Sequence, residues 1–166
     1  MEHRLSIHHW EKRSPDWPSA AVAGFAAAAV LMVVELFWAT LAGNNGPWRI
    51  SQLIAALVLG TGTLQMSGFH FDIGIVIIAL ATHYLLGVLF GLLLAFVLAG
   101  FHYDTSPLAL CVIGATFGIL LYLINFVALT QWVPWFAELR GWSTLAAHLI
   151  FGVSAALLYW KLARRA

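Results

Sequence analysis

Four long stretches of apolar residues alternate with shorter polar segments along the chain. They cover residues 18–43, 73–101, 107–130 and 141–161. At about 1.5 Å per residue, each is long enough as a helix to cross a hydrocarbon layer about 30 Å thick. A chain with 62% hydrophobic and 9% charged residues has too many apolar side chains for one small water-soluble core. The pattern predicts an all-α fold, an integral membrane four-helix bundle that forms a single domain over 1–166.

A shorter apolar segment lies between the first two spans, at residues 48–60. Pro47 is typical of the start of a helix, and Gly60 is typical of its end. The segment is too short to cross the membrane. We therefore expect a short helix that lies in the outer membrane interface or dips into it.

The basic residues predict the orientation of the bundle. They gather before the first span and after the last, at Arg4, Lys12, Arg13, Lys161, Arg164 and Arg165. The connections at the opposite side of the membrane carry only Arg49 and Arg140. Because cytoplasmic flanks of membrane helices retain positive charge, we expect both termini in the cytoplasm, with 1–17 as a cytoplasmic tail.

The second and fourth spans share the pattern Ala-x-His-x-x-x-Gly-Val around His83 and His148. The first and third spans align as well, pairing Gly24 with Gly114, Ala28 with Gly118, and Glu35 with Asn125. The alignment predicts an internal duplication of a two-helix unit, with both copies in the same orientation across the membrane.

Four polar side chains stand out within the apolar spans: Glu35, His83, Asn125 and His148. Counting along each helix places all four at roughly 8 to 14 Å from the non-cytoplasmic end. A carboxylate in hydrocarbon is costly unless it faces the bundle interior and has a partner. We expect the four to form a polar cluster inside the bundle, with Glu35 paired to His83 and Asn125 paired to His148.

The two histidines allow three interpretations, of which a structural one comes first. Small residues near them are typical of close helix crossings, namely Gly87, Gly91, Gly114, Gly118 and Gly152. In this interpretation the imidazoles are hydrogen-bonded links between helices. The functional alternatives are a quinone headgroup or proton site, and axial ligation of a haem b by His83 and His148.

Other chemistry has little support in the sequence. The single cysteine, Cys111, lies within a span, and the histidines at 3, 8 and 9 lack accompanying carboxylates, so we predict no metal site. No nucleotide-binding or hydrolase motif is present, and a net charge of +1 does not indicate nucleic acid. Glu138 and Arg140 are expected to pair with each other or to cap a helix near the outer surface. We predict that the protein is not an enzyme.

The arrangement resembles small four-helix bacterial inner-membrane proteins of unknown function, which share two inward histidines and an interfacial insertion after the first helix. The resemblance implies a bacterial inner membrane but transfers no activity. With few ionisable groups, the chain is expected to act through partners, namely lipids and other subunits. We predict a non-catalytic accessory subunit of a larger respiratory, electron-transport complex, such as a terminal oxidase. The alternatives are a haem- or quinone-binding subunit, and a small transporter that uses Glu35 as its coupling carboxylate.

Overall fold

The computed structural model describes residues 14–42, 45–100 and 106–164, and this part of the chain is entirely helical outside its turns. Four long apolar helices have the length and composition needed to cross a membrane. They are α1 (Trp17–Ala42), α3 (Ile73–Gly100), α4 (Pro107–Leu123, extended by further helical turns to Gln131) and α5 (Trp142–Ala163). The predicted all-α class and the four apolar helices are confirmed. Most of the predicted tail, residues 1–13, lies outside the described residues.

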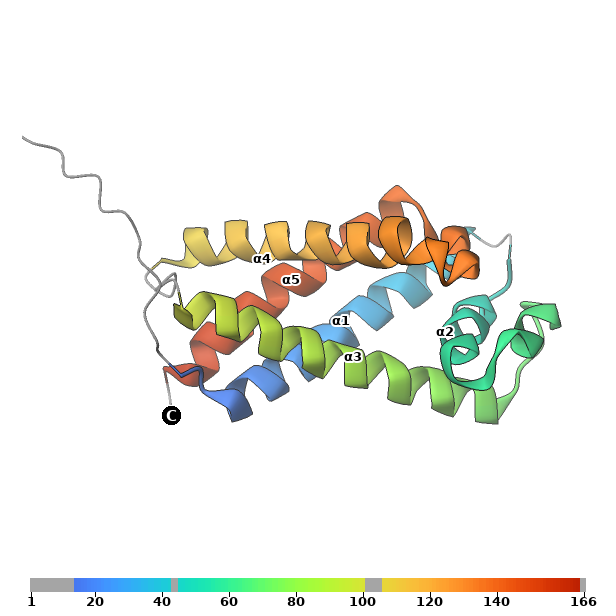
Figure 1. Cartoon of the computed structure of the whole chain (residues 1–166), viewed down its shortest axis with the longest axis horizontal. Coiled ribbons are helices and arrows are strands. Elements are labelled where there is room, and N and C mark those ends of the chain that lie inside the picture. Colours follow the sequence, from blue (N-terminus) through green and yellow to red (C-terminus); the bar gives the residue numbers. More distant parts are fainter. Residues whose placement is uncertain (1–13, 43–44, 101–105, 165–166) are drawn as a thin grey trace, which may run out of the picture.

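The two central helices of the bundle are α1 and α5, which pack against each other. α3 packs mainly on α1 at one edge, and α4 packs on α5 at the other. Figure 1 shows α1 beginning and α5 ending at the same end of the bundle, while α2 lies at the opposite end. We call the latter the α2 end. Toward it, α3 and α4 diverge in this view.

Short polar caps set where three of the long helices begin. The Asp16 carboxylate accepts hydrogen bonds from the backbone N–H and the hydroxyl of Ser19 at the start of α1. Asp72 Oδ1 accepts from the Gly74 and Ile75 N–H groups before α3. Ser106 Oγ accepts from the Ala109 N–H, with Pro107 in the first turn of α4. Such caps satisfy N–H groups that have no partner within the helix.

The third span departs from the uninterrupted helix expected over 107–130. α4 ends at Leu123 and continues as a π-helix, η2 (Ile124–Ala128), and a 3-10 turn, η3 (Leu129–Gln131). Arg140 reaches back from the following connection, and its Nε donates to the Phe126 carbonyl at 2.6 Å. The wider π turn changes which face the residues after Leu123 present, and Asn125 lies within it.

Glycine pairs allow the helices of each hairpin to touch through their backbones. A side chain on Gly91 would meet the Ala20 carbonyl oxygen of α1 at 2.8 Å. A side chain on Gly152 would overlap the Gly114 carbonyl of α4 and lie 2.9 Å from the Gly118 N–H nitrogen. Only glycine permits such close approach without moving a helix. Gly87, Gly91, Gly114, Gly118 and Gly152 are all buried at these two crossings.

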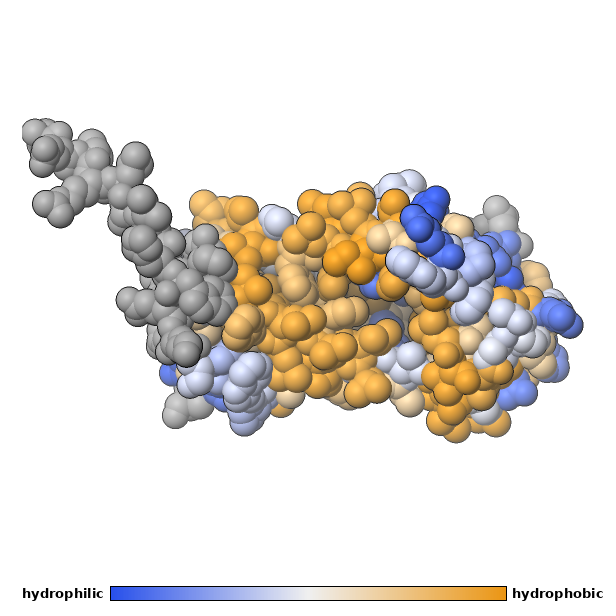
Figure 2. Space-filling view, in the orientation of Figure 1, coloured by the Kyte–Doolittle hydropathy of each residue, from blue (hydrophilic) through white to orange (hydrophobic). Residues whose placement is uncertain are grey.

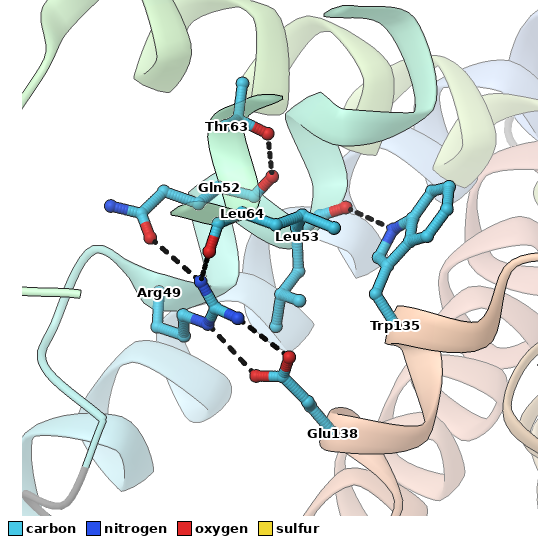
Figure 3. Close-up of polar contacts among 7 residues, drawn as sticks. All are labelled: Arg49, Gln52, Leu53, Thr63, Leu64, Trp135 and Glu138. Atoms are coloured by element: carbon cyan, nitrogen blue, oxygen red, sulfur yellow. Dashed lines mark hydrogen bonds and ion pairs between the residues drawn. The ribbon is translucent and has the colours of Figure 1, made fainter. Parts of the chain in front are cut away.

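The segment between α1 and α3 folds over the α2 end of the bundle. It contains α2 (Arg49–Leu59) and a 3-10 helix, η1 (Thr61–Gln65). The connection before α5 holds another 3-10 helix, η4 (Pro134–Leu139). Trp135 Nε1 of η4 donates to the Leu53 carbonyl of α2 at 3.1 Å (Figure 3). This bond and an ion pair described below attach the insertion to the second hairpin.

The outward surface of the long helices is apolar, as expected for contact with lipid. Phe37, Leu85, Leu108 and Val112 are among the large side chains that are more than half exposed. Figure 2 shows hydrophobic surface along α3 and α4 on the viewed face, with a small hydrophilic area between them toward the α2 end. The core near the other end consists of small and aliphatic residues, such as Ala20, Ala23, Leu94 and Leu98.

The contacts between hairpins bear on the predicted duplication without deciding it. Each hairpin has its own glycine crossing at the aligned positions, α1 with α3 and α4 with α5. The extensive contact between the hairpins joins α1 to α5, which are not equivalent members of the repeat. The duplication and the orientation in the membrane stay predictions.

Candidate functional site

A cavity of about 320 Å³ lies between α3 and α4. We call it the lateral cavity. Its back is formed by α1 and α5, and its sides by α3 and by α4 with η2. Ile54 and Leu57 of α2 and Phe136 of η4 cover it toward the α2 end. Most of the lining is aliphatic or aromatic, including Leu31, Phe90 and Phe151.

All four predicted polar residues line this cavity: Glu35 from α1, His83 from α3, Asn125 from η2 and His148 from α5. They come from different segments, so only the assembled bundle brings them together. His148 is buried, with 8% of its surface exposed, while the other three are partly buried. The hydrophilic area in Figure 2 lies on the viewed face, between α3 and α4, the two helices that form the sides of the lateral cavity.

The two histidines do not form the expected pairs with Glu35 and Asn125. His83 Nε2 donates instead to the Ala28 carbonyl of α1 at 2.9 Å, and so links two helices. His148 Nδ1 donates to the Thr144 carbonyl at 2.8 Å, one turn earlier in its own helix. Backbone carbonyls are available at every turn of a helix, and these two lie closer to the imidazoles than the predicted side-chain partners do.

Glu35 and Asn125 have no side-chain hydrogen bond or ion pair with any described residue. Both side chains border a mostly apolar cavity. A carboxylate near the centre of a bilayer costs about 3 kcal/mol, and an unpaired amide is also unfavourable there. These two groups therefore have unused hydrogen-bonding capacity directed toward whatever fills the lateral cavity.

The backbone bonds fix which nitrogen of each imidazole is left for a ligand. A carbonyl can only accept, so the bonded nitrogen of each neutral ring carries the proton. His148 then offers the lone pair of Nε2, and His83 offers the lone pair of Nδ1. The Glu35 carboxyl group accepts when ionised and also donates when protonated, and Asn125 can both donate and accept. The two imidazole nitrogens are complementary to a hydrogen-bond donor.

This geometry bears on the predicted haem b. Axial ligation by two histidines requires both rings to direct a nitrogen at one iron. His148 has the usual arrangement for a metal ligand, because its Nδ1 is held by a carbonyl and its Nε2 is available. His83 has its Nε2 directed at Ala28 instead. His83 would have to ligate through Nδ1, and the haem stays a prediction.

A second cavity, of about 260 Å³, lies at the α2 end, and we call it the end cavity. Its lining is more polar and includes Asn45, Arg49, Glu138, Arg140 and Ser143. Glu35 lines both cavities and forms part of the wall between them.

The ion pair at the end cavity differs from the one expected. Glu138 pairs with Arg49 of α2, through Nη2 at 2.7 Å and Nε at 3.0 Å, and not with its near neighbour Arg140 (Figure 3). Arg49 Nη1 also donates to the Leu64 carbonyl at 2.9 Å. Arg140 is held by the Phe126 carbonyl and by Thr130 Oγ1. The Arg49–Glu138 pair joins residues 89 positions apart in the chain. The local spacing of charged residues therefore could not predict it.

Transport across the whole bundle would need a polar route to the other end. Both cavities lie in the half near α2, and the buried core beyond them is mainly aliphatic, with Ala20, Leu94 and Leu98 each at most 1% exposed. Within residues 14–42, 45–100 and 106–164, no three His, Cys, Asp or Glu side chains are grouped as metal ligands would be. The arrangement supports binding in one half of the membrane more than passage through it.

No family model, curated protein or solved structure matches this chain.

Proposed function

We propose that this protein is a non-catalytic membrane subunit that binds the headgroup of a lipid-soluble quinol in the lateral cavity. The observation that carries the proposal is the unpartnered Glu35 and Asn125 beside two imidazoles, in a cavity between two candidate membrane-spanning helices. A ligand with a polar ring and a hydrocarbon tail satisfies both the polar residues and the apolar surroundings.

The size of the cavity supports a ligand that is only partly enclosed. Small-molecule sites usually measure about 300 to 1,000 Å³, and the lateral cavity, at about 320 Å³, is at the lower limit. It accommodates a ring-sized headgroup and the first part of a tail. The remainder of the tail would leave between α3 and α4 and lie among the acyl chains, where it needs no enclosure.

The acceptors in the cavity support the reduced form of the ligand. A quinol carries two hydroxyl groups that donate, whereas a quinone carries two carbonyl oxygens that accept. The Glu35 carboxylate and His148 Nε2 can each accept a hydrogen bond from a quinol hydroxyl group. A quinone would leave both acceptors without a donor. A buried acceptor without a donor costs about 1 to 3 kcal/mol.

We place this role within a larger energy-transducing complex, such as a respiratory terminal oxidase. Amino-acid side chains of this kind can hold a quinol but cannot accept its electrons. A partner with a redox group would oxidise the bound quinol, and the chain would serve as an accessory subunit. On a native gel of solubilised membranes, the protein should migrate with such a complex, and migration as an isolated monomer would contradict this part of the proposal.

Equilibrium binding to the protein in nanodiscs tests the ligand directly. A short-chain quinol should bind saturably, and about tenfold more tightly than the matching quinone, since one charge-assisted hydrogen bond contributes about 1.4 kcal/mol more. Glu35→Gln should lose most of that preference. Leu85→Ala, on the lipid-facing side of α3 and outside the cavity, is the control and should leave both affinities unchanged. Absence of saturable quinol binding would refute the proposal.

A further inference from the structure

We propose that Glu35 exchanges protons between the ligand in the lateral cavity and water in the end cavity, on the α2 side of the membrane. This inference rests on the proposed quinol site and adds the side of the membrane with which that site exchanges protons. Of the residues that line either cavity, Glu35 is the one ionisable side chain that lines both. The other shared residue is Leu139, which cannot carry a proton.

The end cavity has the features of a water-filled entrance. Asn45, Glu138 and Arg140 in its lining are exposed at the α2 end of the molecule. Thr144 and Ser143 lie in the first turn of α5 and continue the polar lining. A cavity of about 260 Å³ with several polar partners is roomy enough for several water molecules, each of which occupies about 30 Å³ in the liquid.

The charged neighbours of Glu35 in the end cavity have other partners. Arg49 is bound by Glu138 and by the Leu64 carbonyl. Arg140 is bound by the Phe126 carbonyl and by Thr130. No ion pair with either arginine therefore holds the Glu35 carboxylate in its charged form, and it remains available to take up and release a proton.

The exchange needs only O–H bonds to change. The Glu35 carboxylate accepts a proton from a ligand hydroxyl, so an O–H bond breaks on the ligand and forms on the carboxyl group. The carboxyl group then passes the proton to water in the end cavity and returns to the carboxylate. No electrons move in either step, and the reverse sequence returns a proton to the ligand. The buried core on the other side of Glu35 is mainly aliphatic, so exchange is directed to the α2 end.

Thiol labelling tests whether water reaches Glu35. Cys111→Ser removes the single native cysteine and provides the background for Glu35→Cys. A membrane-impermeant, cationic methanethiosulfonate reagent is added separately to right-side-out and inverted membrane vesicles. We expect Glu35→Cys to react from the α2 side at least tenfold faster than Val33→Cys and Phe37→Cys. These controls flank Glu35 on the same helix, and both side chains are 62% exposed on the lipid-facing surface.

Two further variants and one reagent complete the test. Ser143→Cys lines the end cavity alone and should also react from the α2 side. A water-soluble carbodiimide added from the α2 side should modify the native Glu35 carboxyl group, and bound quinol should slow this modification but not the labelling of Ser143→Cys. The modified residue is located by mass spectrometry, and this measurement also serves if Glu35→Cys does not fold.

The outcomes separate this inference from the proposed function. Labelling of Glu35→Cys no faster than of Val33→Cys, or labelling from the opposite side, would overturn the proton route even if quinol binds. Carbodiimide modification of native Glu35 from the α2 side that quinol does not slow would overturn the link between the two cavities. Loss of quinol binding itself would remove the proposed function, whatever the labelling shows.

Discussion

The α1–α3 crossing and the α4–α5 crossing have the same spacing of glycine and histidine, but their histidines form different hydrogen bonds. His83 spans the first crossing and donates to the Ala28 carbonyl of the neighbouring helix. His148 stays on its own helix and donates to the Thr144 carbonyl. One imidazole links two helices, and the other does not.

The residue opposite each histidine differs between the two crossings. A side chain on Gly118 would overlap the His148 carbonyl, so the α4 and α5 backbones touch at this level. At the aligned position of the first crossing, Ala28 carries a methyl group, and that methyl meets the position that a side chain on Gly87 would occupy. The two crossings therefore differ by one methyl group next to the histidines.

The largest effect is expected from adding a methyl group where the backbones touch. Gly152→Ala places a Cβ against the Gly114 backbone, which cannot move without separating α4 from α5. We expect a loss of about 3 kcal/mol in the free energy of unfolding, as for an overpacked core. Gly24→Ala, which meets the backbones of Gly87 and Gly91, should lose a similar amount. Unfolding in detergent measures both.

The matched control for these variants is Gly62→Ala. No other atom lies within 4 Å of the position of its added Cβ. Its free energy of unfolding should stay within about 0.5 kcal/mol of the parent protein. If Gly152→Ala were as stable as this control, the result would contradict the close backbone approach of α4 and α5 at their crossing.

An intermediate effect is expected from removing the histidines one at a time. His83→Leu removes a bond between helices and should lower the free energy of unfolding by about 1 kcal/mol. His148→Leu removes a bond within one helix and should cost less. His70→Leu, at an exposed position before α3, is the control and should change little. A larger loss for His148→Leu than for His83→Leu would contradict the comparison of the two crossings.

The smallest effect is expected where the insertion of the first hairpin meets the second hairpin. Glu138→Gln removes the ion pair to Arg49, while Arg49 keeps its bond to the Leu64 carbonyl. Because Glu138 is 40% exposed, we expect a loss of about 0.5 kcal/mol, which should shrink in 1 M salt. Unfolding at low and high salt measures it, with Arg49→Lys as a variant that keeps the charge. A loss of several kcal/mol would mean that the insertion depends on this pair far more than its exposure indicates.

Particular residues show how far prediction from sequence reached. The depth of Glu35, His83, Asn125 and His148 follows from helical rise alone, and the four line one cavity. Their hydrogen-bond partners could not be predicted in the same way, because backbone carbonyls compete with side chains as acceptors. Which acceptor is used depends on how the helices pack. The π turn at Ile124–Ala128 was also missed, since nothing in the local sequence distinguishes it from α-helix. It is accompanied by a bond from Arg140, which lies beyond the end of the span.

The sequence by itself determined that this protein is helical and has four apolar helices long enough to span a membrane. That conclusion depends on each segment separately, because a chain in lipid must satisfy its backbone groups within its own helices. Only the tertiary structure decided that α1 and α5 lie at the centre, that α3 and α4 diverge around a polar cavity, and that Glu35 borders two cavities. These features depend on the distances between segments, which are set by contacts such as Gly118 with His148 and Arg49 with Glu138, between residues far apart in the chain.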